Sequence, residues 1–213
     1  MVNDMENVYV FKHNSIKIIY NNLRVYIDPF KIDTVSHDAD IIFVTHSHYD
    51  HFSIDDIIKI KKDSTKIVST KDTYKELIKY FKEDDILMVE PNGNYDILGI
   101  NFNTVRAYNV NKDFHPISND WVGYILTLND KKHYIMGDTD INDDILNIKC
   151  DILFIPIGGT YTMDYKEAAD YTNKISPNVV IPTHYGLIVG DKSLGVKFNN
   201  LLSSDIKCEL YIK

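Results

Sequence analysis

The sequence predicts a mixed α/β (α+β) fold in which two similar halves form one unit. Short β-branched and aromatic runs alternate with helical patterns along the chain. The order of elements in the second half resembles that in the first, and no Pro-, Gly- or Ser-rich linker separates the halves. We therefore expect residues 1–213 to form a single domain.

The first half is predicted to have the order β-β-β-β-α-β-α. Its strands are expected at 8–12, 16–20, 24–29, 40–45 and 66–69, with turn residues between the first three. Ser53 followed by Asp56 three residues later is typical of a helix start, which predicts a helix over about 54–62. The run TYKELIKYF, residues 73–81, has apolar residues at the i, i+3, i+4, i+7 spacing of an amphipathic helix.

The second half repeats this outline with more strands. Strands are predicted at 86–90, 95–98, 100–108, 122–129, 133–138, 151–158, 178–184 and 208–212. Helices are predicted at 163–175 and 193–202, and Ser176-Pro177 closes the first of them. We find no short-period repeat and no low-complexity tract in the sequence.

Composition and charge narrow the classes of partner. The net charge of −8 disfavours binding to a nucleic-acid backbone or to an anionic membrane, which both require a basic face. Cys150 and Cys208 provide neither a disulfide framework nor a metal-binding spacing. Without a signal peptide or a transmembrane run, the expected location is the cytoplasm and the expected partner a small-molecule substrate, with an oligomer possible.

The motif VTHSHYDHFS, residues 44–53, is the main indication of function. His46, His48, Asp50 and His51 directly follow an apolar strand in a chain with eight histidines. The alternative to a metal site is a histidine-rich loop that is exposed to solvent and has no function. Four ligands this close in sequence do not easily close on one ion, so their spacing favours two ions that are each completed by distant residues. Imidazole with carboxylate favours zinc, with manganese or iron as alternatives.

Two other predicted strands also end in metal-ligand residue types. Asp138 follows the strand 133–138 in the run MGDTD, and His184 ends the strand 178–184. Ligands of open α/β folds lie at the carboxyl ends of strands. We therefore expect these distant segments to meet in one cleft.

These motifs together resemble the metallo-β-lactamase superfamily. HSHYDH, then GDTD, then PTHYG occur in the order of that family. The resemblance implies a four-layer αβ/βα sandwich in which Asp138 bridges two metal ions and His184 completes the second site. VFKHNSIKI, YIDPF and DILFIPIGGTYTMDYKEAA resemble the branch of ascorbate-6-phosphate lactonase-like and N-acylphosphatidylethanolamine phospholipase-D-like proteins, although Lys12 stands where that branch has glycine.

One metal ligand differs from the family pattern. A histidine is expected after a middle strand, but Asn109 stands there in RAYNVNKDFHP, and His115 follows six residues later. We prefer His115 as the ligand because imidazole binds zinc far better than a carboxamide does. The loop would then have to fold back. If Asn109 serves instead, the first site is weak or takes a harder metal.

Several further residues have two possible roles. His13 either contacts the substrate or packs at a strand end, and Asp28 either orients a ligand histidine or starts a turn. His37 and His133 lie among charged residues and are predicted to face solvent. Aromatic residues flank the motifs and either line a pocket or belong to the core: Tyr49, Tyr108, Phe114, Trp121 and Tyr161.

The resemblance implies hydrolysis by a hydroxide bound to two metal ions, acting on an ester, a lactone or a phosphodiester. Asp50 would ligate the second ion and orient the hydroxide, while His13 or Tyr161 would donate a hydrogen bond or a proton. The main alternative is a non-catalytic metal-binding or regulatory domain. A true β-lactamase, a processive RNA-processing nuclease and a di-iron redox enzyme are each less favoured, because the chain shows no export signal, no inserted domain and no flavin partner domain.

Overall fold

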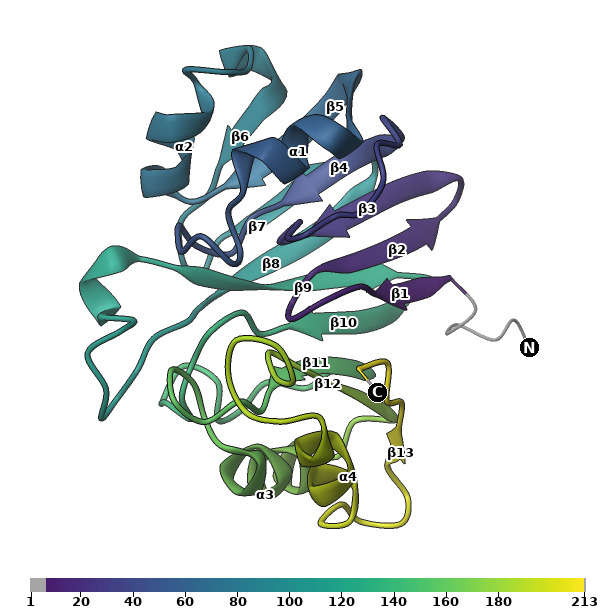
Figure 1. Ribbon diagram of the computed structural model, residues 1–213, viewed down its shortest axis with the longest axis vertical. Helices are drawn as coiled ribbons and strands as arrows, with labels where there is room; N and C mark the ends of the chain where they lie inside the picture. Colours follow the sequence, from purple (N-terminus) through teal and green to yellow (C-terminus); the bar gives the residue numbers. More distant parts are fainter. Residues whose placement is uncertain (1–6, 213) are drawn as a thin grey trace. The chain divides into compact units, whose positions relative to one another are not determined.

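The computed structural model describes residues 7–212. The chain divides into two compact units, Met1–Val89 and Glu90–Lys213. Figure 1 shows the path of the chain through each unit. Each unit consists of one sheet with helices packed on one of its faces.

The first unit contains one sheet whose order follows the sequence. Its strands are β1 (Val8–Val10), β2 (Ile16–Tyr20), β3 (Leu23–Ile27), β4 (Ala39–Phe43), β5 (Lys61–Ser69) and β6 (Ile86–Met88). Its helices are α1 (Ile54–Ile60), α2 (Lys71–Leu77) and the 3₁₀ turn η1 (Glu83–Asp85). Neighbouring strands are antiparallel from β1 to β3 and parallel from β3 to β6.

The second unit has the same plan in a longer form. Its strands are β7 (Asn94–Ile97), β8 (Ile100–Arg106), β9 (Val122–Leu128), β10 (Lys131–Ile135), β11 (Ile152–Pro156), β12 (Val179–Thr183) and β13 (Lys207–Cys208). Its helices are α3 (Tyr165–Ile175), α4 (Ser193–Asn199) and the 3₁₀ turn η2 (Ile117–Asn119). Neighbours are antiparallel from β7 to β10 and parallel from β10 to β13. The similarity of the two halves that the sequence predicted is therefore present in their strand order.

Strand direction determines which loops gather at each sheet edge. In the first unit β1, β3 and β4 run the same way, because two antiparallel steps separate β1 from β3. In the second unit β8, β10, β11 and β12 likewise share one direction. The loops that follow these strands therefore lie together at one edge of their own sheet, where ligands of α/β proteins bind.

An apolar core joins helices and sheet in each unit. In the first, Ile57 and Ile60 of α1 and Leu77 of α2 pack with Ile42 and Ile67 of the sheet. In the second, a larger cluster joins α3 and α4 to β9–β12. Burying a side chain of this size contributes roughly 1.5–3 kcal/mol, so these cores hold the strand ends in fixed positions.

Side chains cap the starts of α1 and α3. The Ser53 side chain accepts a hydrogen bond from the Asp56 N–H at the start of α1, as predicted. The Asp56 carboxylate accepts the backbone N–H groups of Lys31 and Ile32, so it ties the loop after β3 to the helix. Helix α3 begins with a full capping box formed by Asp164 and Glu167.

Several predicted boundaries were wrong. Residues 86–88 belong to the first sheet as β6, beside β5, and not to the second half. The helix predicted at 73–81 is α2 and ends at Leu77, where the N–H groups of Tyr80 and Phe81 both turn back to the Leu77 carbonyl. The strand predicted at 208–212 pairs only at Lys207–Cys208.

His133 was predicted to face solvent and is instead buried. It lies on β10, between β9 and β11, opposite Leu126 and Ile152. The neighbouring lysines suggested exposure, but the position within the sheet determines burial. His37 is exposed, as predicted.

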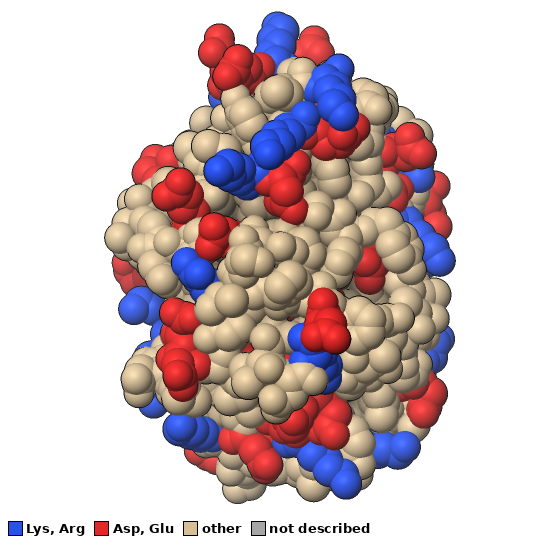
Figure 2. Space-filling view, turned by 90° about the vertical axis from the view of Figure 1, so that its left-hand side faces the viewer, with Lys and Arg blue, Asp and Glu red and all other residues tan. Residues whose placement is uncertain are grey.

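No helix within residues 7–212 has the length and apolar character needed to cross a bilayer. On the face drawn in Figure 2, lysine and arginine side chains lie among aspartate and glutamate side chains.

Candidate metal centre

The histidine cluster of the first unit lies at the edge where β1, β3 and β4 end. His13 follows β1, Asp28 follows β3, and the motif from Thr45 to His51 follows β4. His13 and Asp28 have positive φ angles of 60° and 47°, a conformation that non-glycine residues seldom adopt. Such local strain is found where surrounding structure fixes a functional residue.

Hydrogen bonds to the Asp28 carboxylate hold the other residues of this cluster in place. Its side chain is fully buried, and its Oδ1 accepts the Thr45 N–H at 2.8 Å. Its Oδ2 accepts from Asn14 Nδ2 at 2.8 Å, from Thr45 Oγ1 at 2.7 Å and from His51 Nδ1 at 2.7 Å. Of the two roles that the sequence left open for Asp28, these contacts favour orienting a histidine, here His51, which the sequence predicts as a metal ligand.

These hydrogen bonds determine which nitrogen of each imidazole carries a proton. A carboxylate only accepts, so His51 Nδ1 donates to Asp28 and Nε2 carries the lone pair. The Thr45 hydroxyl gives its own proton to Asp28, so at 3.0 Å it accepts from His46 Nδ1. His46 therefore also presents Nε2 for coordination, in the manner of metal-binding histidines.

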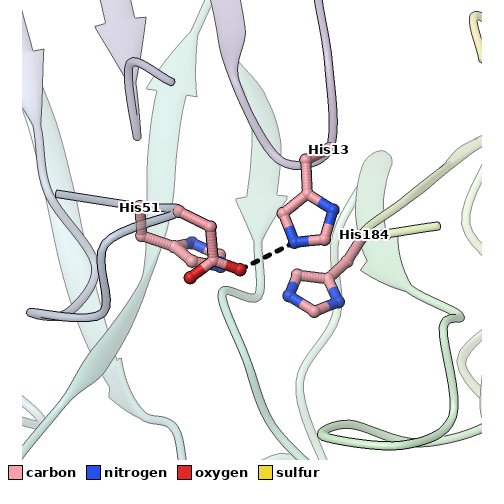
Figure 3. A group of neighbouring side chains, drawn as sticks. His13, His51 and His184 are labelled. Atoms are coloured by element: carbon pink, nitrogen blue, oxygen red, sulfur yellow. Dashed lines mark hydrogen bonds and ion pairs between the residues drawn. The ribbon is translucent and has the colours of Figure 1, made fainter. Parts of the chain in front are cut away.

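Two groups of ligand atoms converge within the first unit. His46 Nε2 lies 3.2 Å from His48 Nδ1. Asp50 Oδ2 lies 2.9 Å from His13 Nε2 and 3.9 Å from His51 Nε2 (Figure 3). His46 and His48 thus meet through ring nitrogens, while Asp50 contacts His13 and lies near His51; the His46 and His51 rings also lie close together, with their centroids 4.0 Å apart.

The second unit brings together a carboxylate and two imidazoles. Asp138 follows β10, and His184 follows β12. Asp138 Oδ2 lies 2.9 Å from His184 Nε2 and 3.2 Å from His115 Nε2. All three residues are buried. The loop that carries His115 does fold back, because the Asn109 N–H donates to the His115 carbonyl at 2.8 Å.

His184 is held by a close backbone contact. A Cβ added to Gly158, in the loop after β11, would lie 2.3 Å from the His184 carbonyl oxygen and 2.4 Å from Val189 Cγ2. His184 itself has a positive φ of 58°. Glycine at 158 therefore permits the approach that places the His184 ring beside Asp138.

These donor sets fit a divalent metal ion. Ligands bound tetrahedrally at 2.0–2.1 Å from one ion lie about 3.3 Å apart. The pairs His46–His48, His115–Asp138 and His184–Asp138 lie at 3.2, 3.2 and 2.9 Å. Neutral imidazole nitrogens and carboxylate oxygens are ligands of zinc, manganese and iron. The residues present in each unit thus suit such an ion in chemistry and spacing.

The aromatic residues flanking the motifs have different roles. Trp121 is buried, and its ring meets the His115 ring at 5.5 Å between centroids. Phe114 is half exposed and meets Tyr161 edge to face at 4.6 Å, while Tyr49 is exposed against Phe30. Trp121 thus packs against the His115 ring, whereas Phe114 and Tyr49 present apolar surface to solvent.

Sequence reasoning missed several supporting residues. Thr45 and Asn14 complete the hydrogen bonds of Asp28 in the first unit. Asp140 holds the loop of His115 in the second, by accepting from Val110 N and Lys112 Nζ. Thr45 and Asp140 lie within the motifs VTHSHYDHFS and GDTD, which is the one signal that could have indicated them.

Comparison with known proteins identifies the family. Residues 7–184 match the model of the beta-lactamase superfamily domain. The chain belongs to the metallo-β-lactamase superfamily. It is 30% identical over 195 residues to a UPF0173 metal-dependent hydrolase of Thermoplasma volcanium, covering 85% of this chain and 84% of that one. A similar protein of Nanoarchaeum equitans is 34% identical over 182 residues, covering 81% and 80% of the two chains.

The fold of this superfamily member is also seen in solved structures. A crystal structure of a protein described as a metal-dependent hydrolase from Parabacteroides distasonis matches with a TM-score of 0.81 and 26% identity, covering 97% of this chain and 93% of that one. The metallo-β-lactamase fold that the motifs predicted is therefore confirmed.

Proposed function

We propose that this chain is a hydrolase that uses two divalent metal ions, zinc in the first instance and manganese or iron as alternatives. His46, His48 and His115 would bind one ion, Asp50, His51 and His184 the other, and Asp138 would bridge them. The observation that carries the proposal is the convergence of ligand atoms within each unit at spacings of 2.9–3.2 Å. The ordered family motifs support joining the two sets in one centre.

When bound, two such ions lower the pKa of a shared water to near neutrality and polarise the bond under attack. The chain's own residues then position the reactants. Asp50 would orient the nucleophile, and His13, whose Nε2 donates to Asp50 at 2.9 Å, would hold that carboxylate in place. Tyr161 would donate a hydrogen bond from its hydroxyl to the substrate or the leaving group.

The substrate classes that fit this chemistry are esters, lactones and phosphodiesters. All present an electrophilic carbon or phosphorus with an oxygen that a cation can polarise. The superfamily membership and the hydrolase names of the relatives support the reaction type. A small-molecule substrate agrees with the mixed charge of the surface in Figure 2.

Metal content and turnover test the proposal together. Purified protein should contain close to two divalent ions per chain by elemental analysis. It should hydrolyse at least one member of a panel of bis-p-nitrophenyl phosphate, a homoserine lactone, a sugar lactone, a thioester and a cephalosporin. Bound metal with no turnover on a broad panel would instead favour the metal-binding or regulatory alternative.

A ligand variant sharpens this test. His51→Ala should lose one ion per chain and reduce hydrolysis by orders of magnitude, because His51 is fixed by Asp28 with Nε2 available for coordination. His37→Ala is the matched control, since His37 is exposed and its ring nitrogen Nδ1 hydrogen-bonds the Lys61 carbonyl. Unchanged turnover of His51→Ala with unchanged metal content would refute the two-metal site.

A further inference from the structure

The side chain of Asn109 lies between His115 and Tyr161. Its Nδ2 donates to the Tyr161 carbonyl at 2.9 Å, and its Oδ1 accepts the His115 backbone N–H at 3.0 Å. A carbonyl can only accept and an N–H can only donate, so both contacts require the same orientation of the amide. The Asn109 oxygen is therefore fixed toward His115.

This oxygen determines the proton position on the His115 ring. His115 Nδ1 lies 2.9 Å from Asn109 Oδ1, so Nδ1 must carry the proton that forms this hydrogen bond. Nε2 then carries the lone pair, and it is the atom that lies 3.2 Å from Asp138 Oδ2. Metal-binding histidines use this arrangement, in which the second nitrogen donates to an acceptor behind the ring.

The turn that carries Asp138 also holds the loop between Asn109 and His115. Asp140 accepts from Val110 N at 3.1 Å and from Lys112 Nζ at 2.5 Å. Its own N–H donates to the Tyr108 carbonyl at 3.0 Å. The segment 138–140 therefore does two things. Its Asp140 anchors the start of the loop, and its Asp138 carboxylate faces His115 at the end of the loop.

We propose that Asn109 is the positioning residue of His115. Asn109 stands at the sequence position where the family pattern has a ligand histidine, and its carboxamide orients His115, six residues later, to serve as the ligand instead. It does so by closing the loop and by fixing the Nδ1–H tautomer. The proposal rests on the proposed function only in that Nε2 of His115 is meant for a metal ion; the tautomer itself is a property of the metal-free chain.

The tautomer can be read directly by NMR. In metal-free wild-type protein, at a pH where the His115 ring is neutral, the ¹⁵N shifts should show the proton on Nδ1. Asn109→Asp keeps an oxygen facing the ring and should keep this tautomer, while it loses the donation to the Tyr161 carbonyl. Asn109→Leu removes the acceptor at similar size, so His115 should become a mixture of tautomers. Asn101→Leu, on the exposed surface of β8, is the matched control and should resemble wild type.

Metal affinity gives a second readout, with zinc titrated against a chromophoric chelator. Loss of a partner of this kind lowers metal affinity about 10–100-fold, so Asn109→Leu should bind zinc more weakly by that factor and Asn109→Asp should recover most of it. Retention of both the Nδ1–H signal and full affinity in Asn109→Leu would overturn the proposal. If Asn109→Leu fails to fold, an Nε2–H tautomer in wild type would overturn it equally.

The two proposals can fail separately. A wild-type chain that shows the Nδ1–H tautomer but binds no metal would refute the proposed function and support the role of Asn109. A chain that binds two ions and hydrolyses substrate with His115 in the Nε2–H tautomer when metal-free would support the function and overturn the role of Asn109.

Discussion

Replacing Asp28 by asparagine should destabilise the first unit and weaken its metal site together. The Asp28 carboxylate is fully buried and accepts four hydrogen bonds, one at Oδ1 and three at Oδ2. An amide has one oxygen and one NH₂ group. In its better orientation the oxygen keeps the three bonds at the Oδ2 position, and the NH₂ faces the Thr45 N–H.

The expected loss in the free energy of unfolding follows from the contact between the new NH₂ group and the Thr45 N–H. One hydrogen bond to a charged group is lost, and the Thr45 N–H and the new NH₂ group face each other without an acceptor, which together amount to about 2–4 kcal/mol. The neutral oxygen also polarises the His51 ring less than a carboxylate does, so zinc affinity should fall about 10–100-fold.

Urea unfolding in the presence of a chelator measures the first effect, and competition with a chromophoric chelator measures the second. Asp33→Asn is the matched control, because its carboxylate is 79% exposed and, within residues 7–212, forms an ion pair only with Lys12. The control should change the free energy of unfolding by less than about 0.5 kcal/mol. An Asp28→Asn variant that matches wild type in both stability and zinc affinity would refute this account of the cluster.

Three further predictions concern other parts of the chain. Gly158→Ala should lower the free energy of unfolding by about 2–3 kcal/mol and weaken zinc binding, because its Cβ would meet the His184 carbonyl at 2.3 Å; unchanged zinc affinity would contradict this. Burial raises the pKa of the Cys150 and Cys208 thiols to about 12, so neither should react with iodoacetamide at pH 8 until the chain unfolds, as mass spectrometry can verify. Burial acts to raise the pKa of Asp38, but hydrogen bonds from Lys17, Ser36 and Tyr26 outweigh it and lower this pKa to about 2. The resulting stabilisation, less than about 1 kcal/mol after solvent screening, is complete above pH 4 and lost as the pH falls toward 2. Asp38→Asn should therefore flatten that part of the acid unfolding curve, and an identical curve would exclude the contribution.

Local chemistry predicted those elements whose causes lie within a few residues. The Ser53 cap of α1 followed from a side chain next to the backbone group that it satisfies, and the helix predicted at 163–175, observed as α3, from its helical run and the Ser176-Pro177 end. Residues 86–88 could not be assigned to a sheet in this way, because an apolar run of this kind fits the sheet of either half. Only its pairing with β5 shows that it belongs to the first sheet. His133 was misplaced for the same reason, because burial on β10 depends on the strands at both sides.

The candidate site was predictable where motif and ligand chemistry agree. The placement of the predicted ligands after strand ends needed only residue types and strand order: His46, His48, Asp50 and His51 follow β4, and Asp138 and His184 follow β10 and β12. The choice of His115 over Asn109 rested on ligand chemistry alone. The position of His115 depends on Asp140, which holds the loop, and on the Tyr161 carbonyl, which orients Asn109. These groups lie 31 and 52 residues from Asn109 along the chain, so no local sequence pattern indicates the contacts.

The central claim is that two metal ions are held by residues from both halves of the chain. A crystal structure of the zinc-loaded protein, with anomalous data at the zinc edge, tests it most directly. We predict two anomalous peaks, with His46, His48 and His115 about 2.0–2.2 Å from one, Asp50, His51 and His184 at the same range from the other, and Asp138 between them. A single peak, peaks away from these side chains, or Asn109 in place of His115 as a ligand would contradict the account.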